Sequence, residues 1–140
     1  MYKRQDGELK EYVMQFLLKD SRINYVGKVS GELKEEILKK CDVLIVPSIW
    51  DEPFGRVILE AYKYGMPVIG SQYGGIPEVI SNESGIIVNP NNEELGNAIK
   101  YMSNRENIKF YYKGIYSKLK EFSVDSNIDK YEDFFKNTVK

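Results

Sequence analysis

Histidine is absent from this chain of 140 residues, and cysteine occurs once. Without histidine, the chain alone cannot build a Ser-His-Asp triad, a Cys-His pair or a histidine-ligated metal site. A single cysteine cannot form an internal disulfide, which agrees with a reducing, cytoplasmic location. We interpret Cys41 as a small core residue, because an apolar run begins two residues after it.

Long apolar segments and an excess of one charge are also missing. The sequence contains no run of about 18 apolar residues, the length needed to span a membrane. The opening MYKRQDGELK lacks the apolar centre of a signal peptide. Lys and Arg number 20 against 21 Asp and Glu, so no general attraction to nucleic acid follows. The local basic residues Lys109, Lys113, Lys118 and Lys120 are interpreted as a solvated helix face.

Apolar runs that alternate with amphipathic segments are present instead. They predict an α/β fold with a Rossmann-like parallel sheet, about four strands, flanking helices and a helical C-terminus. The expected strands are 23–26, 43–47, 67–70 and 86–88. The expected helices are 6–19, 31–40, 55–64, 76–80, 93–103, 106–122 and 125–139. Ser30 is the expected cap of the second helix, which should bury Leu33, Ile37 and Leu38, and Gly114 is a weak point of the sixth.

Residues 47–77 carry most of the chemical information: PSIWDEPFGRVILEAYKYGMPVIGSQYGGIP. A helical pattern begins at Gly55, after a loop that holds Glu52, and Glu60 lies roughly 7 Å further along that helix. Unpaired amides at a helix start attract anions, and a glycine lets a phosphate come close. A carboxylate accepts the hydroxyls of a diol. The order carboxylate, helix start, carboxylate therefore predicts subsites for a sugar, a diphosphate and a ribose.

This segment resembles the E-x7-E motif of retaining glycosyltransferases with the GT-B fold, especially glycosyltransferase family 4. Glu52 and Glu60 are the two acids. CDVLIVPS precedes the motif, and EAYKYGMPVIGS, YGGIPEVI and SGIIVNP follow it in the family's order. The resemblance runs from Asp6 to Tyr131. It implies that the chain is the C-terminal, nucleotide-sugar-binding half of such an enzyme, acting in polysaccharide biosynthesis.

The resemblance also implies the roles of single residues. Glu52 would bind hydroxyls of the transferred sugar, and Glu60 would bind the ribose. The backbone of the four residues after Pro53 would face the sugar and the distal phosphate. A loop earlier in the chain would border the base. A pair of glycines after the motif helix would either lie near the phosphates or only turn the chain. These donor-binding residues are Phe54, Gly55, Arg56 and Val57, then Gly27, Lys28 and Val29, then Gly74 and Gly75. Arg56 departs from the family, in which this position is often apolar. It would add charge to the phosphate or point to solvent. Trp50 is interpreted as a core anchor more readily than as a ligand stack.

A complete domain of the resembled family has a six-stranded sheet in the order 3-2-1-4-5-6. The runs seen here match its third to sixth strands, so we expect one partial domain over 1–140, truncated at its N-terminus and without the acceptor domain. That missing domain would be the chain's intramolecular partner. The missing stretch would also supply basic residues for the diphosphate. We therefore expect the chain alone to be inactive and to bind donor with a dissociation constant at or above about 1 mM.

The expected function is retaining transfer of a hexosyl group from a nucleotide-diphosphate sugar to a carbohydrate or lipid-linked acceptor. The nucleotide sugar is a substrate, and no cofactor or metal is expected, because Asp51 and Glu52 form too sparse a cluster. Peripheral membrane association of the full-length enzyme stays open. So do two other functions. Unchanged turnover in a full-length Glu52→Ala variant would favour a non-catalytic nucleotide-binding scaffold. Donor hydrolysis without an acceptor would favour a related nucleotide-sugar epimerase.

Overall fold

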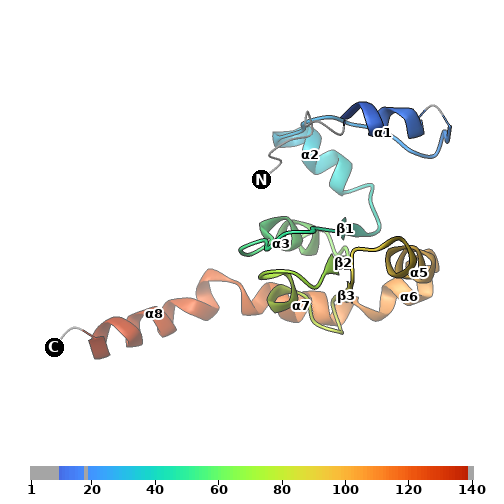
Figure 1. Ribbon diagram of the computed structural model, residues 1–140. Helices are drawn as coiled ribbons and strands as arrows, with labels where there is room; N and C mark the ends of the chain where they lie inside the picture. The colour runs from blue at the N-terminus through green and yellow to red at the C-terminus, as the bar shows by residue number, and fades with distance from the viewer. Residues whose placement is uncertain (1–9, 18, 139–140) are drawn as a thin grey trace. The chain divides into compact units, whose positions relative to one another are not determined.

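The structure, a computed structural model, describes residues 10–17 and 19–138. The chain divides into two compact units, Met1–Lys40 and Cys41–Lys140, each of which is described by itself. The described helices of the first unit are α1 (Lys10–Leu17) and α2 (Gly31–Leu38) (Figure 1). The helix expected over 6–19 is thus confirmed for residues 10–17, and residues 6–9 lie outside the described part.

Three details of the first unit differ from expectation. Residues 23–26 form no strand with any described residue, and Ile23 and Val26 are 43% and 52% exposed. An apolar run becomes a strand only where a ladder partner satisfies its backbone and its neighbours cover one face. Ser30 stands at the N-cap of α2 but its side chain makes no capping hydrogen bond. Of the three side chains that α2 was expected to bury, Leu38 is buried and Ile37 half-buried, but Leu33 is 56% exposed.

The second unit is built on a parallel sheet of three strands in the order β1-β2-β3. The strands are β1 (Leu44–Val46), β2 (Val68–Ser71) and β3 (Gly85–Val88). Every residue of the central strand β2 is buried, as expected for a parallel strand that is covered on both faces. The predicted α/β fold with a parallel sheet is therefore confirmed, with three strands in place of about four.

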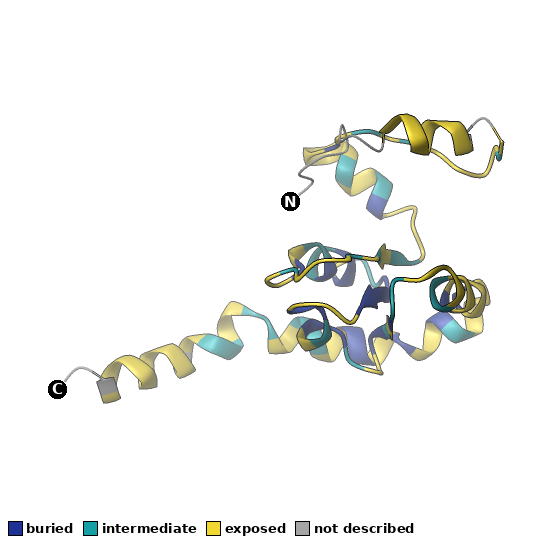
Figure 2. Cartoon of the chain, viewed as in Figure 1, coloured by how far each residue is buried: buried dark blue, intermediate teal, exposed yellow. Residues whose placement is uncertain are grey.

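Helices cover both faces of this sheet. α3 (Arg56–Tyr62) contacts β1, α4 (Ile76–Val79) contacts β2, and α5 (Asn92–Met102) contacts β2 and β3. Figure 1 shows α3 and α5 on opposite sides of the strands. The remaining helices are α6 (Arg105–Phe110), α7 (Tyr112–Glu121) and α8 (Val124–Thr138). Buried residues gather around β2, whereas α8 is mainly exposed (Figure 2).

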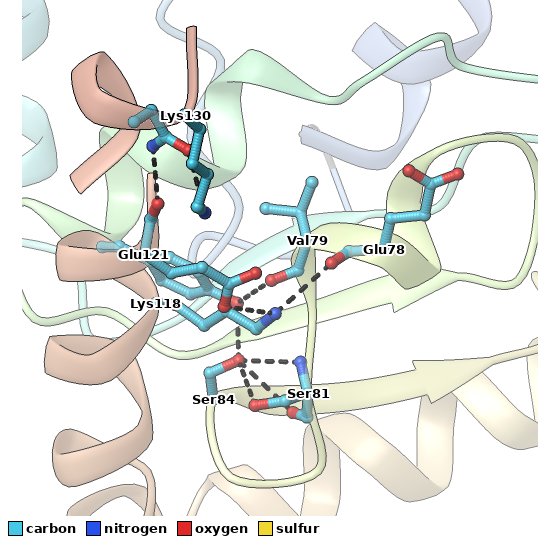
Figure 3. Close-up of polar contacts among 9 residues, drawn as sticks. Glu78, Val79, Ser81, Ser84, Lys118, Glu121 and Lys130 are labelled. Atoms are coloured by element: carbon cyan, nitrogen blue, oxygen red, sulfur yellow. Dashed lines mark hydrogen bonds and ion pairs between the residues drawn. The ribbon is translucent and has the colours of Figure 1, made fainter. Parts of the chain in front are cut away.

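A buried polar cluster fixes α3 to the turn between α4 and β3. The Tyr62 hydroxyl lies 2.8 Å from Ser84 Oγ, which also accepts a hydrogen bond from the Ser81 amide at 2.9 Å (Figure 3). Burial raises the pKa of Tyr62 to about 12, against the smaller opposing effect of the Ser84 hydrogen bond. The cluster joins α3 to this turn, and each of the polar groups named has a hydrogen-bond partner.

The helix expected over 106–122 and the core position expected for Cys41 are both wrong. The helix expected over 106–122 is two helices, α6 and α7, which meet at Tyr111 and not at Gly114. Gly114 lies buried inside α7, where a Cβ would stand 2.0 Å from the Glu83 carbonyl oxygen. It therefore permits close packing of α7 on the preceding turn. Cys41, expected in the core, is exposed, because it lies outside the sheet, before β1 begins.

Candidate functional site

Two loops leave the carboxyl ends of adjacent parallel strands in the second unit. One follows β1 and holds Glu52, and the other follows β2 and holds the Gly74–Gly75 turn. Parallel neighbours end at the same edge of a sheet, which is where open α/β folds bind ligands. The Gly75 amide donates a hydrogen bond to the Glu52 carbonyl oxygen at 2.7 Å. The structure thus brings Glu52, Gly74 and Gly75 together.

The close approach of these loops depends on the two glycines. A Cβ at Gly74 would stand 2.4 Å from the carbonyl oxygen of Glu52, and one at Gly75 would stand 2.4 Å from that of Pro53. Gly74 also has φ 59, in the left-handed region, which glycine adopts without steric cost. Gly74 and Gly75 therefore do more than turn the chain, because any side chain there would displace the Glu52 loop.

Gly55 ends the first loop and starts α3. Its φ of 71 and ψ of 48 are left-handed, and as the N-cap it offers no capping side chain to the helix amides. A Cβ here would stand 2.9 Å from Ile58 Cδ1. Arg56 and Val57 are the first helical residues, one position later than expected. The Arg56 side chain is exposed.

The two acids of the motif are both half-buried. Glu52 lies in the loop after β1, and Glu60 lies one turn after Arg56 in α3. Glu60 Oε2 is itself buried. Glu60 is therefore not a plain solvent-facing helix acid.

The residues predicted to border the base lie in the first unit. Gly27 has φ 64, Lys28 is exposed, and Val29 is 8% exposed. This unit is described separately from the one that holds the motif, so the place of the base stays a prediction.

Sequence reasoning missed a contact behind the motif loop. The Phe54 ring packs edge-on against the Phe122 ring, with centroids 5.6 Å apart and an interplanar angle of 81°. Lys118 lies 5.5 Å over that second ring, and its side chain is only 16% exposed. Its assignment to a solvated helix face is therefore wrong. Trp50 is 55% exposed, so its interpretation as a core anchor is also wrong.

Neither a metal cluster nor a membrane span occurs in the part of the chain that the structure describes. In residues 10–17 and 19–138, no group of three or more His, Cys, Asp or Glu side chains could hold a metal ion. Within that same part of the chain, no helix is both long and apolar enough to cross a membrane.

Known proteins resemble this chain over most of its length. The family described as glycosyl transferases group 1 matches residues 4–115. An uncharacterized glycosyltransferase of Methanocaldococcus jannaschii is 33% identical over 129 residues, which are 89% of this chain and 36% of that protein. Another from the same organism is 35% identical over 92 residues, which are 63% of this chain and 23% of that protein. The chain thus spans about a quarter to a third of these relatives.

Solved structures share the fold. Sucrose-phosphate synthase from Thermosynechococcus elongatus matches 99% of this chain and 36% of its own, with a TM-score of 0.76 and 25% identity. An Anabaena protein in complex with UDP matches 98% of this chain and 38% of its own, with a TM-score of 0.78 and 21% identity. The second unit's parallel sheet and flanking helices match the C-terminal domains of GT-B glycosyltransferases.

Proposed function

Because the chain belongs to the glycosyl transferases group 1 family, we propose that it is the nucleotide-sugar-binding part of a retaining glycosyltransferase of family 4. The full enzyme would move a hexosyl group to a carbohydrate or lipid-linked acceptor in the cytoplasm. The rest of that enzyme would supply the acceptor site.

The observation that carries this proposal is the contact between the two loops at the carboxyl edge of the sheet. The Gly75 amide donates a hydrogen bond to the Glu52 carbonyl oxygen at 2.7 Å. Helix α3 starts directly after the loop that holds Glu52, and it carries Glu60. The matched family region includes all of these residues. We assign Glu52 to the transferred sugar and Glu60 to the ribose. The residues assigned to the diphosphate and the attached sugar are Phe54, Gly55, Arg56, Val57, Gly74 and Gly75, and those assigned to the base are Gly27, Lys28 and Val29.

Ligand-observed NMR with UDP-glucose tests these assignments. UDP is the chosen nucleotide because the similar Anabaena protein is known in complex with it. Saturation transfer detects weak binding, which suits the expected dissociation constant at or above about 1 mM. We expect Glu60→Gln to weaken the ribose signals and Glu52→Gln to weaken the hexose signals. Each lost charge-assisted hydrogen bond costs about 1.5–3 kcal/mol.

Glu93→Gln is the matched control, since this exposed glutamate lies in the first turn of α5. It should leave both sets of signals unchanged. Wild-type protein without any UDP-glucose signal would contradict the proposed ligand. Glu52 and Glu60 variants that behave like the Glu93 variant would contradict the assigned roles.

A further inference from the structure

The segment Glu52–Gly55, hereafter the donor loop, is contacted from two directions in the structure. Gly75 lies against its backbone, where a Cβ would stand 2.4 Å from the Pro53 carbonyl oxygen. The Phe122 ring meets the Phe54 ring edge-on at 5.6 Å. Such aromatic pairs contribute beyond the apolar area that they bury. One contact comes from the neighbouring sheet loop, and the other comes from the end of α7.

Phe122 is itself held in place by Lys118. The Phe122 amide donates to the Lys118 carbonyl oxygen at 3.0 Å, which fixes the last turn of α7. Lys118 Nζ lies 5.5 Å over the Phe122 ring, and it pairs with Glu121 at 3.0 Å. The same Nζ donates to the Glu78 carbonyl oxygen at 3.4 Å, which ties α7 to α4 (Figure 3). A cation over an aromatic face adds to the stability of this arrangement.

The following residues hold Phe122 from the other side. Asn127 Nδ2 donates to the carbonyl oxygens of Glu121 and Ser123, both at 2.8 Å. These two acceptors flank Phe122 in the chain. The ring that meets Phe54 is therefore carried by a backbone that hydrogen bonds fix before and after it.

We propose that Phe122 is a positioning residue for the donor loop. Its ring limits the movement of Phe54. This keeps the Glu52 backbone in contact with Gly75, and it keeps Gly55 in place at the start of α3. The positioning of the loop stands on the geometry, and its importance for donor binding rests on the proposed function.

Amide hydrogen exchange of the whole chain tests the positioning. The Gly75 amide reports on the donor loop through its bond to Glu52, and the Gln72 amide, bonded to the Val88 carbonyl oxygen at 3.1 Å, reports on the nearby sheet. Phe122→Ala should speed exchange at Gly75 about fivefold, which is about 1 kcal/mol, and leave Gln72 unchanged. A residue with only a general structural role would speed both amides alike. Phe122→Tyr keeps the ring and should restore slow exchange.

Phe110→Ala is the control. Phe110 lies in α6, and its ring pairs with the Tyr111 ring and not with the donor loop. Both amides should keep their wild-type rates in this variant. Acrylamide quenching of Trp50 gives a second readout, because it is the sole tryptophan and lies two residues before Glu52. We expect stronger quenching in Phe122→Ala and unchanged quenching in Phe110→Ala.

UDP-glucose binding separates this inference from the proposed function. Phe122→Ala should weaken binding about fivefold. Unchanged Gly75 exchange in Phe122→Ala, or equal acceleration at Gly75 and Gln72, would overturn the positioning role whatever the ligand does. Accelerated Gly75 exchange in a chain whose wild type binds no UDP-glucose would support the positioning role and contradict UDP-glucose as the ligand instead.

Discussion

At the scale of single residues, Gly74 and Gly65 share a left-handed backbone but have different surroundings. Their φ values are 59 and 72. A Cβ at Gly74 would meet the backbone of Glu52 at 2.4 Å, whereas a Cβ at Gly65 would meet nothing within 4 Å. Gly65→Ala should therefore cost only the conformational penalty of about 1–2 kcal/mol. Gly74→Ala should cost more and also displace the donor loop.

Urea unfolding and UDP-glucose saturation transfer measure the two consequences. We expect both variants to lose stability and only Gly74→Ala to lose the ligand signals. Equal losses of stability with ligand signals retained in both variants would show that the contact between Gly74 and Glu52 has no role in holding the loop.

Tyr62 makes stability depend on pH in the alkaline range. Burial raises the pKa of its hydroxyl from 10.0 to about 12, so the folded state favours the neutral phenol. The resulting stabilisation is fully present below pH 10 and is lost as the pH rises towards 12, by up to about 3 kcal/mol. Tyr62→Phe should be less stable at pH 8 by about 1 kcal/mol, the hydrogen bond to Ser84 being lost.

The measurement compares urea unfolding of wild type and Tyr62→Phe between pH 8 and pH 12. Lysine titration affects both proteins alike, so the difference between them isolates Tyr62. That difference should shrink and then change sign as the pH rises. A constant difference would mean that the phenol does not titrate with a shifted pKa.

Sequence order was enough to predict which residues form the two loops of the candidate site and the start of α3. Glu52, Gly55 and Glu60 lie close along the chain, and the two glycines after β2 could be named from the family's order. Phe122 could not be found, because its contact with Phe54 depends on how the end of α7 packs. The burial of Lys118 depends on the same packing, which no helical periodicity encodes.

At the scale of elements, two helical glycines have opposite expected effects when changed to alanine. A Cβ at Gly96 in α5 would meet nothing within 4 Å, whereas a Cβ at Gly114 in α7 would stand 2.0 Å from the Glu83 carbonyl oxygen. Gly96→Ala should stabilise by about 0.5–1 kcal/mol through helix propensity. Gly114→Ala should instead destabilise by about 1–3 kcal/mol, because α7 must move away from the turn.

Thermal unfolding of both variants gives the comparison directly, since the substitution is chemically the same. The melting temperature should rise for Gly96→Ala and fall for Gly114→Ala. A rise in both would mean that α7 and the turn before β3 can separate at little cost.

The elements of the second unit could be predicted where apolar runs lie between turn residues. The three strands fall within one residue of the expected bounds, because each is centred on a short apolar run of Leu, Ile or Val. The run at 23–26 has equally apolar ends but no ladder partner among the described residues. The break between α6 and α7 occurs at Tyr111, where neither proline nor glycine marks it. Both outcomes depend on tertiary contacts.

At the scale of the whole molecule, α8 carries large apolar side chains that the described structure leaves exposed. They are Val124, Ile128, Tyr131, Phe134 and Phe135, each at least half exposed. Side chains that keep their exposure on folding contribute little to the free energy of unfolding. A chain that ends at Ser123 keeps Phe122 and should lose less than about 1 kcal/mol, mainly from the Asn127 hydrogen bonds.

Two isoleucine substitutions calibrate this prediction. Ile115 in α7 is 2% exposed and Ile128 in α8 is 51% exposed. Ile115→Ala should cost about 2–5 kcal/mol, and Ile128→Ala should cost less than about 0.5 kcal/mol. Urea unfolding is measured for the two variants and the shortened chain. The slope of the unfolding free energy against urea concentration then shows whether α8 belongs to the cooperative unit. A loss of several kcal/mol on shortening would show that α8 buries apolar surface against another part of the chain or a second copy. Protein-concentration dependence of that loss would then identify the second copy as the source.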